Sequence, residues 1–193
     1  MKLFIDSSTS YLYLAILSCS GDYSYMRYGK NDHSETLVDF LEKFLKEHNV
    51  NLEDINEICV GRGPGSYTGL RIAGTVGKVL AYTKNKIFKS FSSLDLLLAS
   101  VIDTDGKYLI KTLAKKNHSY IKVVEVKQGK LDIIVDDSFV CDDELIKYKE
   151  YTKVEVNDEL FATSLLARKI YDHNLLQEES KYEYVPNYLR SGI

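Results

Sequence analysis

The chain has 193 residues, of which 45% are hydrophobic and 27% are charged, and its net charge is −3. This length fits one large domain or two small ones with a real core, and the composition excludes disordered, collagen-like and coiled-coil classes. Residues 1–100 carry 11 basic and 11 acidic side chains, and residues 101–193 carry 14 and 17. Because neither half has a basic excess, we do not expect the chain to bind nucleic acid by itself.

Features of export and of membrane insertion are missing from the sequence. Asp6 interrupts the amino-terminal apolar residues before a signal-peptide core forms, and the run at 11–17 is too short to cross a bilayer. Cys19, Cys59 and Cys141 are odd in number and far apart, which favours a reducing compartment over a disulfide framework. We therefore expect a soluble, cytoplasmic chain with no membrane partner.

The first part of the chain reads as alternating strands and helices. Three short strands at hairpin spacing predict an antiparallel meander over residues 2–6, 11–17 and 23–28. Asp32 and Glu35 form the pattern of a capping box at the start of a helix, and Ser66 is the expected cap of a second long helix. The elements predicted after the meander are helix 32–48, strand 55–61, helix 67–82, strand 87–91 and helix 94–102.

The pattern changes near residue 103, where a second group of strands begins. The elements predicted there are strands 108–114, 119–126, 131–135 and 151–156, and helices 142–149 and 158–174. A meander followed by alternating elements, and then a second sheet, indicates two α/β lobes. We place the amino-terminal lobe at 1–102 and a smaller, divergent carboxy-terminal lobe at 103–193.

A glycine-rich segment, residues 61–69 (GRGPGSYTG), joins a predicted strand to a helix, and such a junction presents free N–H groups to an anion. It does not match the standard phosphate-binding patterns. A Walker A lysine is missing, Ser66 stands where the dinucleotide fingerprint requires glycine, and Pro64 breaks the G-x-S-x-G pattern. Both interpretations stay open, a phosphate loop and a tight turn that lets backbones approach closely.

The polar turn after the first strand, residues 6–10 (DSSTS), also has two interpretations. A hairpin turn needs such residues, and an actin-like nucleotide site uses the same types to hold a phosphate and a metal-bound water. If a nucleotide pocket survives in vestigial form, its candidate residues are Asp6, Ser7, Thr9, Gly63 and Gly65.

Small residues recur along the second long helix at Gly69, Ala73, Gly77 and Ala81, with Gly74 beside them. A glycine inside a helix costs about 1 kcal/mol relative to alanine, so this row needs a packing reason. The row either packs on the chain's own sheet or lets a helix of another subunit approach closely.

The histidines do not form a metal-binding pattern. His33, His48, His118 and His173 lack the i+3 to i+5 pairing of metal ligands, and none adjoins a cysteine. A nucleophile–histidine arrangement cannot be singled out either. We expect neither a catalytic residue, nor a metal ligand, nor a cofactor site in this chain.

Residues 5–9 (IDSST), 31–35 (NDHSE) and 61–72 (GRGPGSYTGLRI) together resemble the motifs of the TsaB (YeaZ) family, bacterial proteins of tRNA threonylcarbamoyladenosine biosynthesis. Residues 188–190 (YLR) resemble the closing motif of that family, and the likeness fades between 103 and 155. The family belongs to the actin/hexokinase/Hsp70-like superfamily. The resemblance implies an α/β, two-lobed actin-like (ribonuclease H-like) fold, in which each lobe is a mixed sheet flanked by helices.

The resemblance also implies a function and its partners. The chain would be a non-catalytic scaffold or activator subunit, required to form the threonylcarbamoyl group on the adenosine next to the tRNA anticodon. Its dimer partner would be the catalytic paralogue TsaD, and the ATPase TsaE would complete the complex. ATP and metal are expected on the partner subunits, and tRNA is expected to bind only through the complex.

Two positions match metal-binding histidines of the paralogue, and here they hold Ser93 and Leu97; leucine cannot ligate a metal. Family members pair through the two long helices, so the resemblance implies that the small-residue row meets a partner helix. The interface residues expected on this basis are His33, Glu35, Leu37, Leu41, Gly69, Ala73, Gly74, Gly77 and Ala81.

Other functions stay open at this stage. One alternative is a small actin-like nucleotide-binding ATPase or kinase that uses Asp6 and Thr9, and titration with ATP and magnesium discriminates it. Another is a peptidase, an old label of the superfamily, which needs a metal or nucleophile site. The sequence also leaves open whether the free chain is a homodimer.

Overall fold

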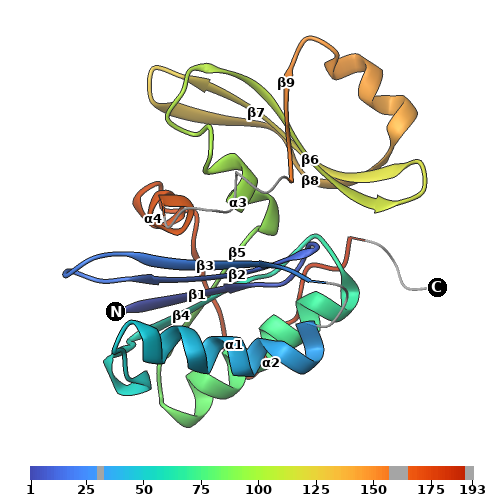
Figure 1. Cartoon of the computed structure of the whole chain (residues 1–193). Helices are drawn as coiled ribbons and strands as arrows, with labels where there is room; N and C mark the ends of the chain where they lie inside the picture. Colours follow the sequence, from blue (N-terminus) through green and yellow to red (C-terminus); the bar gives the residue numbers. More distant parts are fainter. Residues whose placement is uncertain (30–32, 157–164, 190–193) are drawn as a thin grey trace.

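The computed structural model describes residues 1–29, 33–156 and 165–189, without the side chains of 33–35 (Figure 1). Two mixed sheets lie one above the other. Helices α1 (His33–Glu47) and α2 (Tyr67–Thr83) cover the outer face of the first sheet, and α3 (Ser93–Leu98) and α4 (Leu165–Asp172) lie between the sheets (Figure 1). This arrangement is the two-lobed α/β fold predicted from the sequence.

The first sheet has the strand order β10-β5-β4-β1-β2-β3. Its meander consists of β1 (Lys2–Asp6), β2 (Tyr11–Leu17) and β3 (Tyr23–Tyr28), paired antiparallel as predicted. Helix α1 and a 3₁₀ turn (Leu52–Asp54) lead to β4 (Glu57–Gly61), which lies parallel to β1. Helix α2 leads to β5 (Ile87–Phe91), parallel to β4. Because helices carry the chain between parallel strands, their apolar faces bury one side of the sheet.

The second sheet has the order β8-β7-β6-β9. Strands β6 (Gly106–Lys115), β7 (His118–Lys127) and β8 (Lys130–Cys141) form an antiparallel meander, and β9 (Thr152–Glu155) lies parallel to β6. Asn117 turns β6 into β7 with φ 59°, and Gly129 turns β7 into β8 with φ 71°; asparagine and glycine tolerate this left-handed region best. Residues 142–148, predicted as an α-helix, form a 3₁₀ helix (Asp142–Tyr148).

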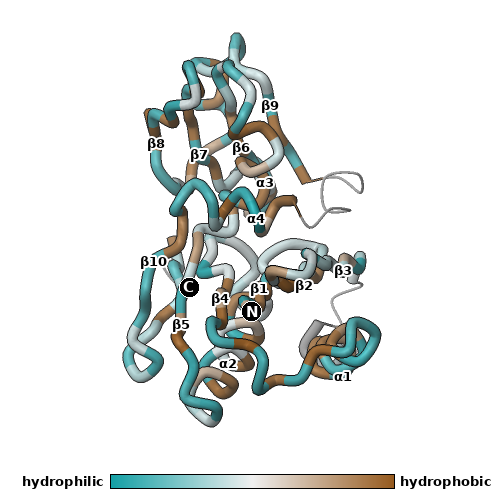
Figure 2. The backbone as a smooth tube through the Cα atoms, turned by 90° about the vertical axis from the view of Figure 1, so that its left-hand side faces the viewer, coloured by the Kyte–Doolittle hydropathy of each residue, from teal (hydrophilic) through white to brown (hydrophobic). Residues whose placement is uncertain are grey.

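Two large apolar clusters place the core, beside a small third cluster within the second lobe. One lies between the first sheet and helices α1 and α2, and Figure 2 shows the hydrophobic residues of this lobe gathered there. The other joins the lobes, because it combines Phe4 and Tyr13 of the first sheet with Leu97 of α3 and with Tyr108 and Val124 of the second sheet. The two lobes therefore share a continuous core through α3.

The boundary predicted at residue 102 separates strands β1–β5 from β6–β9, but the chain crosses back afterwards. Strand β10 (Gln177–Glu178) pairs antiparallel with β5 at the edge of the first sheet. The assignment of 103–193 to one carboxy-terminal lobe is therefore corrected: the last described residues complete the first lobe. The predicted helix 94–102 ends at Leu98, and of the predicted helix 158–174 the structure describes α4. Asp32 of the predicted capping box lies outside the described residues. No described helix has the length and apolar character needed to cross a membrane.

Candidate functional site

Asp6 lies at the end of β1, where the meander, the glycine loop and α3 meet, and it is 2% exposed. Its Oδ1 accepts hydrogen bonds from the Ser8 amide (2.8 Å) and the Ser8 hydroxyl (2.7 Å). Its Oδ2 accepts a hydrogen bond from the Ser93 hydroxyl at 2.6 Å. A buried carboxylate needs such donors, and the chain supplies them from the hairpin turn and from the start of α3.

The glycine loop packs directly on the hairpin turn. The Ser66 amide donates to the Ser8 carbonyl at 2.6 Å, and the Ser7 hydroxyl donates to the Gly69 carbonyl at 2.8 Å. A Cβ on Gly69 would lie 1.8 Å from the Ser7 carbonyl oxygen, and one on Gly65 would lie 2.4 Å from that of Ser8. Glycine is required at both positions because backbone meets backbone, which is the tight-turn interpretation of this loop.

The residues named for a vestigial nucleotide pocket are mostly brought together. Asp6, Ser7, Gly63 and Gly65 lie at the junction of turn and loop, whereas Thr9 stands at its edge and accepts from the Tyr11 amide at 3.1 Å. Two amides of this loop and helix start, those of Gly63 and Gly69, are engaged within the chain. The Gly63 amide donates to the Ser93 hydroxyl (3.0 Å), and the Gly69 amide to the Ser66 hydroxyl (3.3 Å). These contacts explain the glycine pattern without a phosphate.

The two positions that match the paralogue's metal ligands do not fit a metal. Ser93 Oγ is buried between the Asp6 carboxylate and the Gly63 amide, donating to the first and accepting from the second. Leu97 is 1% exposed within the core that joins the lobes, and its side chain has no ligating atom. Within the described residues, His, Cys, Asp and Glu side chains form no group of three able to hold a metal ion.

A second polar cluster, which the sequence analysis missed, lies on the other side of α3. Lys122 of β7 is buried, with Nζ 2.6 Å from Asp95 Oδ1 and 3.1 Å from Asp137 Oδ1. Burial by itself lowers the pKa of a lysine, but the carboxylates of Asp95 and Asp137 outweigh it and hold the pKa of Lys122 above its usual range. The signal in the sequence is a lone lysine inside the apolar run 119–126.

The carboxy-terminal segment, residues 179–189, passes over the glycine loop and α2. The Asn187 amide donates to the Arg62 carbonyl at 2.7 Å. Tyr184 packs edge-on to Phe88 with ring centroids 5.1 Å apart and lies over Gly74, where a Cβ would be 3.0 Å from the tyrosine ring. This segment contains the first two residues of the closing motif, Tyr188 and Leu189; Arg190 lies outside the described residues.

The small-residue row of α2 faces the chain's own sheet, so its assignment to a partner interface is corrected. Ala73 and Ala81 are fully buried in the core between the first sheet and helices α1 and α2. A Cβ on Gly77 would lie 2.4 Å from Val60 Cγ1 of β4. Gly69 meets the hairpin turn and Gly74 meets Tyr184, as described above. The row is small because the helix approaches β4 closely, and none of these positions is available to another subunit.

Two of the interface residues expected on α1 also belong to the interior. Leu37 is 0% and Leu41 is 5% exposed, and both belong to the core between the first sheet and helices α1 and α2. They are therefore corrected to core residues. His33 and Glu35 fall in the first turn of α1, but their side chains lie outside what the structure describes.

The comparisons with known proteins agree with this geometry. Residues 27–180 match the family model described as "TsaD: tRNA N6-adenosine threonylcarbamoyltransferase". The "tRNA threonylcarbamoyladenosine biosynthesis protein TsaB" of Bacillus subtilis (strain 168) is 33% identical over 141 residues, which are 72% of this chain and 61% of that protein. A TsaB of Buchnera aphidicola subsp. Baizongia pistaciae is 28% identical over 64% of this chain and 51% of its own length. The chain thus spans about half to three-fifths of these curated relatives.

The solved structure "YeaZ from Pseudomonas aeruginosa" superposes with a TM-score of 0.77 at 20% identity and covers 97% of this chain and 99% of that one. The shared architecture defines a protein of the two-lobed α/β class. Because the family model covers more than half of the sequence, the chain belongs to the TsaD family of that class, and its curated relatives and structural neighbours are of the TsaB (YeaZ) type.

Proposed function

We propose that this chain is a non-catalytic subunit in tRNA threonylcarbamoyladenosine biosynthesis and that it acts by pairing with a TsaD-like catalytic paralogue. One observation carries the proposal. Ser93 and Leu97 stand where the paralogue's metal ligands are expected, and the chain uses the first to hold Asp6 and the second to fill its core. The names of the curated relatives support the pathway.

The pairing surface in this proposal is the outer face of α2 together with α1. Thr75, Val79 and Tyr82 follow one another along the side of α2 that points away from the sheet, and Val79 and Tyr82 are 53% and 61% exposed. Val38 of α1, a helix that packs beside α2, is 60% exposed. Apolar side chains on two adjacent helices are suited to a helix–helix contact with a partner. A homodimer of the free chain would use the same face.

The proposed binding of tRNA, ATP and metal by partner subunits rests on the charge of this chain and on its loop contacts. The net charge of −3 gives the chain little attraction for phosphates, so tRNA would be held by partner subunits. The Gly63 and Gly69 amides and the Asp6 carboxylate are engaged within the chain, so ATP and metal would bind on TsaD-like and TsaE-like partners.

A binding experiment tests the pairing. The TsaD-like paralogue from the same source is titrated with the chain and with Val79→Asp, which places a charge on the proposed surface. A loss of about 1.4 kcal/mol or more, tenfold in Kd, is expected because a buried carboxylate without a partner is costly. Ile133→Asp is the matched control, since Ile133 is 46% exposed on β8 of the other lobe. Equal effects of the two substitutions would contradict the surface.

An activity experiment tests the absence of catalysis. The purified chain is incubated with threonylcarbamoyl adenylate and unmodified tRNA, with and without the paralogue, and the modified nucleoside is measured by mass spectrometry. Product is expected only when the paralogue is present. Transfer by the chain alone would overturn the proposal.

A further inference from the structure

A buried cation joins the two lobes. Lys122 lies on β7 of the second sheet, and its side chain is 5% exposed. Its Nζ contacts Asp95 of α3, the helix that follows directly from β5 of the first sheet, and Asp137 of the neighbouring strand β8. The two carboxylates are themselves 7% and 6% exposed, whereas Asp136, 3.5 Å from the same ammonium, is 74% exposed.

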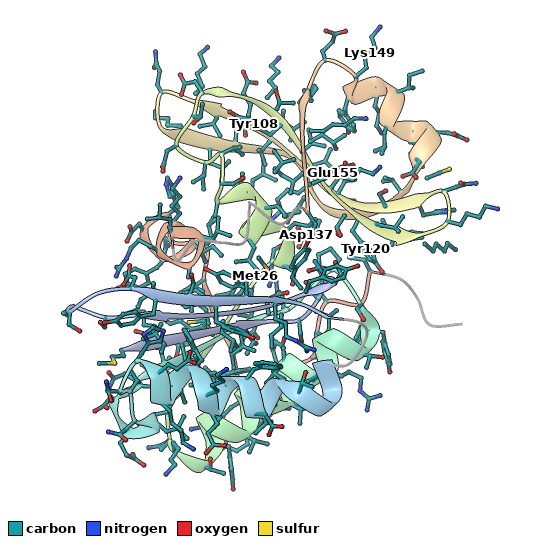
Figure 3. The ribbon with its side chains drawn as sticks, viewed as in Figure 1. Met26, Tyr108, Tyr120, Asp137, Lys149 and Glu155 are labelled. Atoms are coloured by element: carbon teal, nitrogen blue, oxygen red, sulfur yellow. The ribbon has the colours of Figure 1, made fainter. Side chains whose placement is uncertain are left out.

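The cluster continues through α3 to Asp6. The Ser92 hydroxyl donates to Asp137 Oδ1 at 2.8 Å, and the hydroxyl of the next residue, Ser93, donates to Asp6 Oδ2 at 2.6 Å. Figure 3 shows Asp137 at the edge of the second sheet that faces α3 and the first sheet, while Lys149 lies at the opposite end of that lobe. Two consecutive serines thus connect a carboxylate of each sheet at the start of one short helix.

The physical roles of this cluster and of the core around it differ. The apolar core that joins the lobes supplies most of the attraction, but the hydrophobic attraction is by itself not directional. Charge-assisted hydrogen bonds have a fixed length and direction, and a satisfied buried network favours one arrangement. A rotation of the second sheet that separated Lys122 from Asp95 would leave a buried charge without this partner.

We propose that Lys122 is an interlobe latch: its ammonium fixes the orientation of the second sheet on α3 and thereby holds Ser92 and Ser93 on the carboxylates of the two sheets. The latch keeps the lobes in one relative orientation by means of side chains of this chain alone. It goes beyond the proposed function and does not depend on it, because it concerns the geometry of the free chain.

The latch is tested by measuring the distance between the lobes in solution. Nitroxide labels are attached to Lys43→Cys on α1 and Lys127→Cys at the end of β7, both exposed, in a background with Cys19→Ser and Cys141→Ser. Pulsed electron spin resonance then gives the distribution of the inter-label distance. The labelled chain with Lys122, Asp95 and Asp137 intact is expected to give one narrow peak of inter-label distance. A broad distribution, or one with several peaks, for this chain overturns the proposal.

The decisive variant removes every charge of the latch at once, Lys122→Met with Asp95→Asn and Asp137→Asn, so that no buried ion is left unpaired. Its distribution is expected to broaden or shift while circular dichroism shows a folded chain. An unchanged narrow peak in the folded variant overturns the proposal. If the variant does not fold, Asp95→Asn alone decides in the same way, because it removes the charge that pairs Lys122 with α3 and leaves the contact between Lys122 and Asp137 within the second sheet.

Lys111 provides the matched control. It also lies near two carboxylates, Asp142 at 3.9 Å and Glu155 at 3.5 Å, but it is more exposed and all three residues belong to the second lobe. Lys111→Met is therefore expected to leave the inter-lobe distribution unchanged. Broadening as large as that of the latch variant would mean that the distribution reports a general loss of rigidity, and this would overturn the role assigned to Lys122.

Discussion

Substituting Gly77 by alanine separates internal packing of α2 from a role in partner binding. The new Cβ would lie 2.4 Å from Val60 Cγ1 and 3.2 Å from the Phe88 ring, and Val60 is fully buried. Overpacking of this kind costs about 1–3 kcal/mol. Alanine returns about 1 kcal/mol through better helix propensity. The expected net loss of unfolding free energy is about 0–2 kcal/mol, a fall in Tm of up to about 8 °C for a chain of this size.

The assay is chemical or thermal unfolding of the free chain. Thr75→Ala, on the exposed side of the same helix, is the control and is expected to be neutral or slightly stabilising, since propensity alone acts there. Val60→Ala removes the atom that clashes, so Gly77→Ala should cost less in that background, with a coupling of about 1 kcal/mol. If Gly77→Ala instead stabilises the chain as Thr75→Ala does, the helix does not lie against β4 as described and the reasoning fails.

Three further results are expected. Gly61→Ala should abolish soluble expression or lower Tm more than Gly77→Ala, because its Cβ would lie 1.6 Å from Asp6 Oδ2 in the interior; thermal melts that rank the two the other way would contradict this. The bidentate Arg168 guanidinium holds the pKa of Asp22 below its usual range, so this pair stabilises the fold above a pH of about 4 and loses its effect as the pH falls through the lowered pKa. Asp22→Asn should therefore lower stability at pH 7 and flatten the acid limb of the stability curve, and an unchanged acid limb would refute the assignment. Calorimetric titration with ATP and magnesium should give no binding in the millimolar range, because the Gly63 amide and the Asp6 carboxylate are already bonded within the chain; saturable heat would favour the kinase alternative.

Sequence patterns predicted the elements that depend on neighbours along the chain. The meander followed from strand lengths and short turns, and helix α2 was placed within one residue because Ser66 caps it. The small-residue row was also visible, but periodicity tells only that Gly77 and Ala73 share a face. It does not tell whether that face meets the chain's own sheet or another molecule, and the resemblance led to the wrong choice.

Features that depend on distant partners were not predictable in the same way. Strand β8 was expected to end at residue 135, because two aspartates follow and aspartate is unfavourable in strands. It continues to Cys141, and one of those aspartates, Asp137, is compensated by Lys122 and Ser92 from other elements. Strand β10 has only two residues, too few for any pattern, and its pairing with β5 spans most of the second lobe.

The return of the chain to β5 has a consequence for its synthesis. Glu179 meets Ser90 across 89 residues of sequence, and Asn187 completes the hydrogen bonding of the Arg62 carbonyl. A ribosome delivers the meander, α1, α2 and β5 long before these residues, and pairings that close so long a loop form late. While the second sheet emerges, the edge of β5 and the ring of Phe88 are therefore exposed to other chains. The first lobe is therefore synthesised first, but its sheet is completed last.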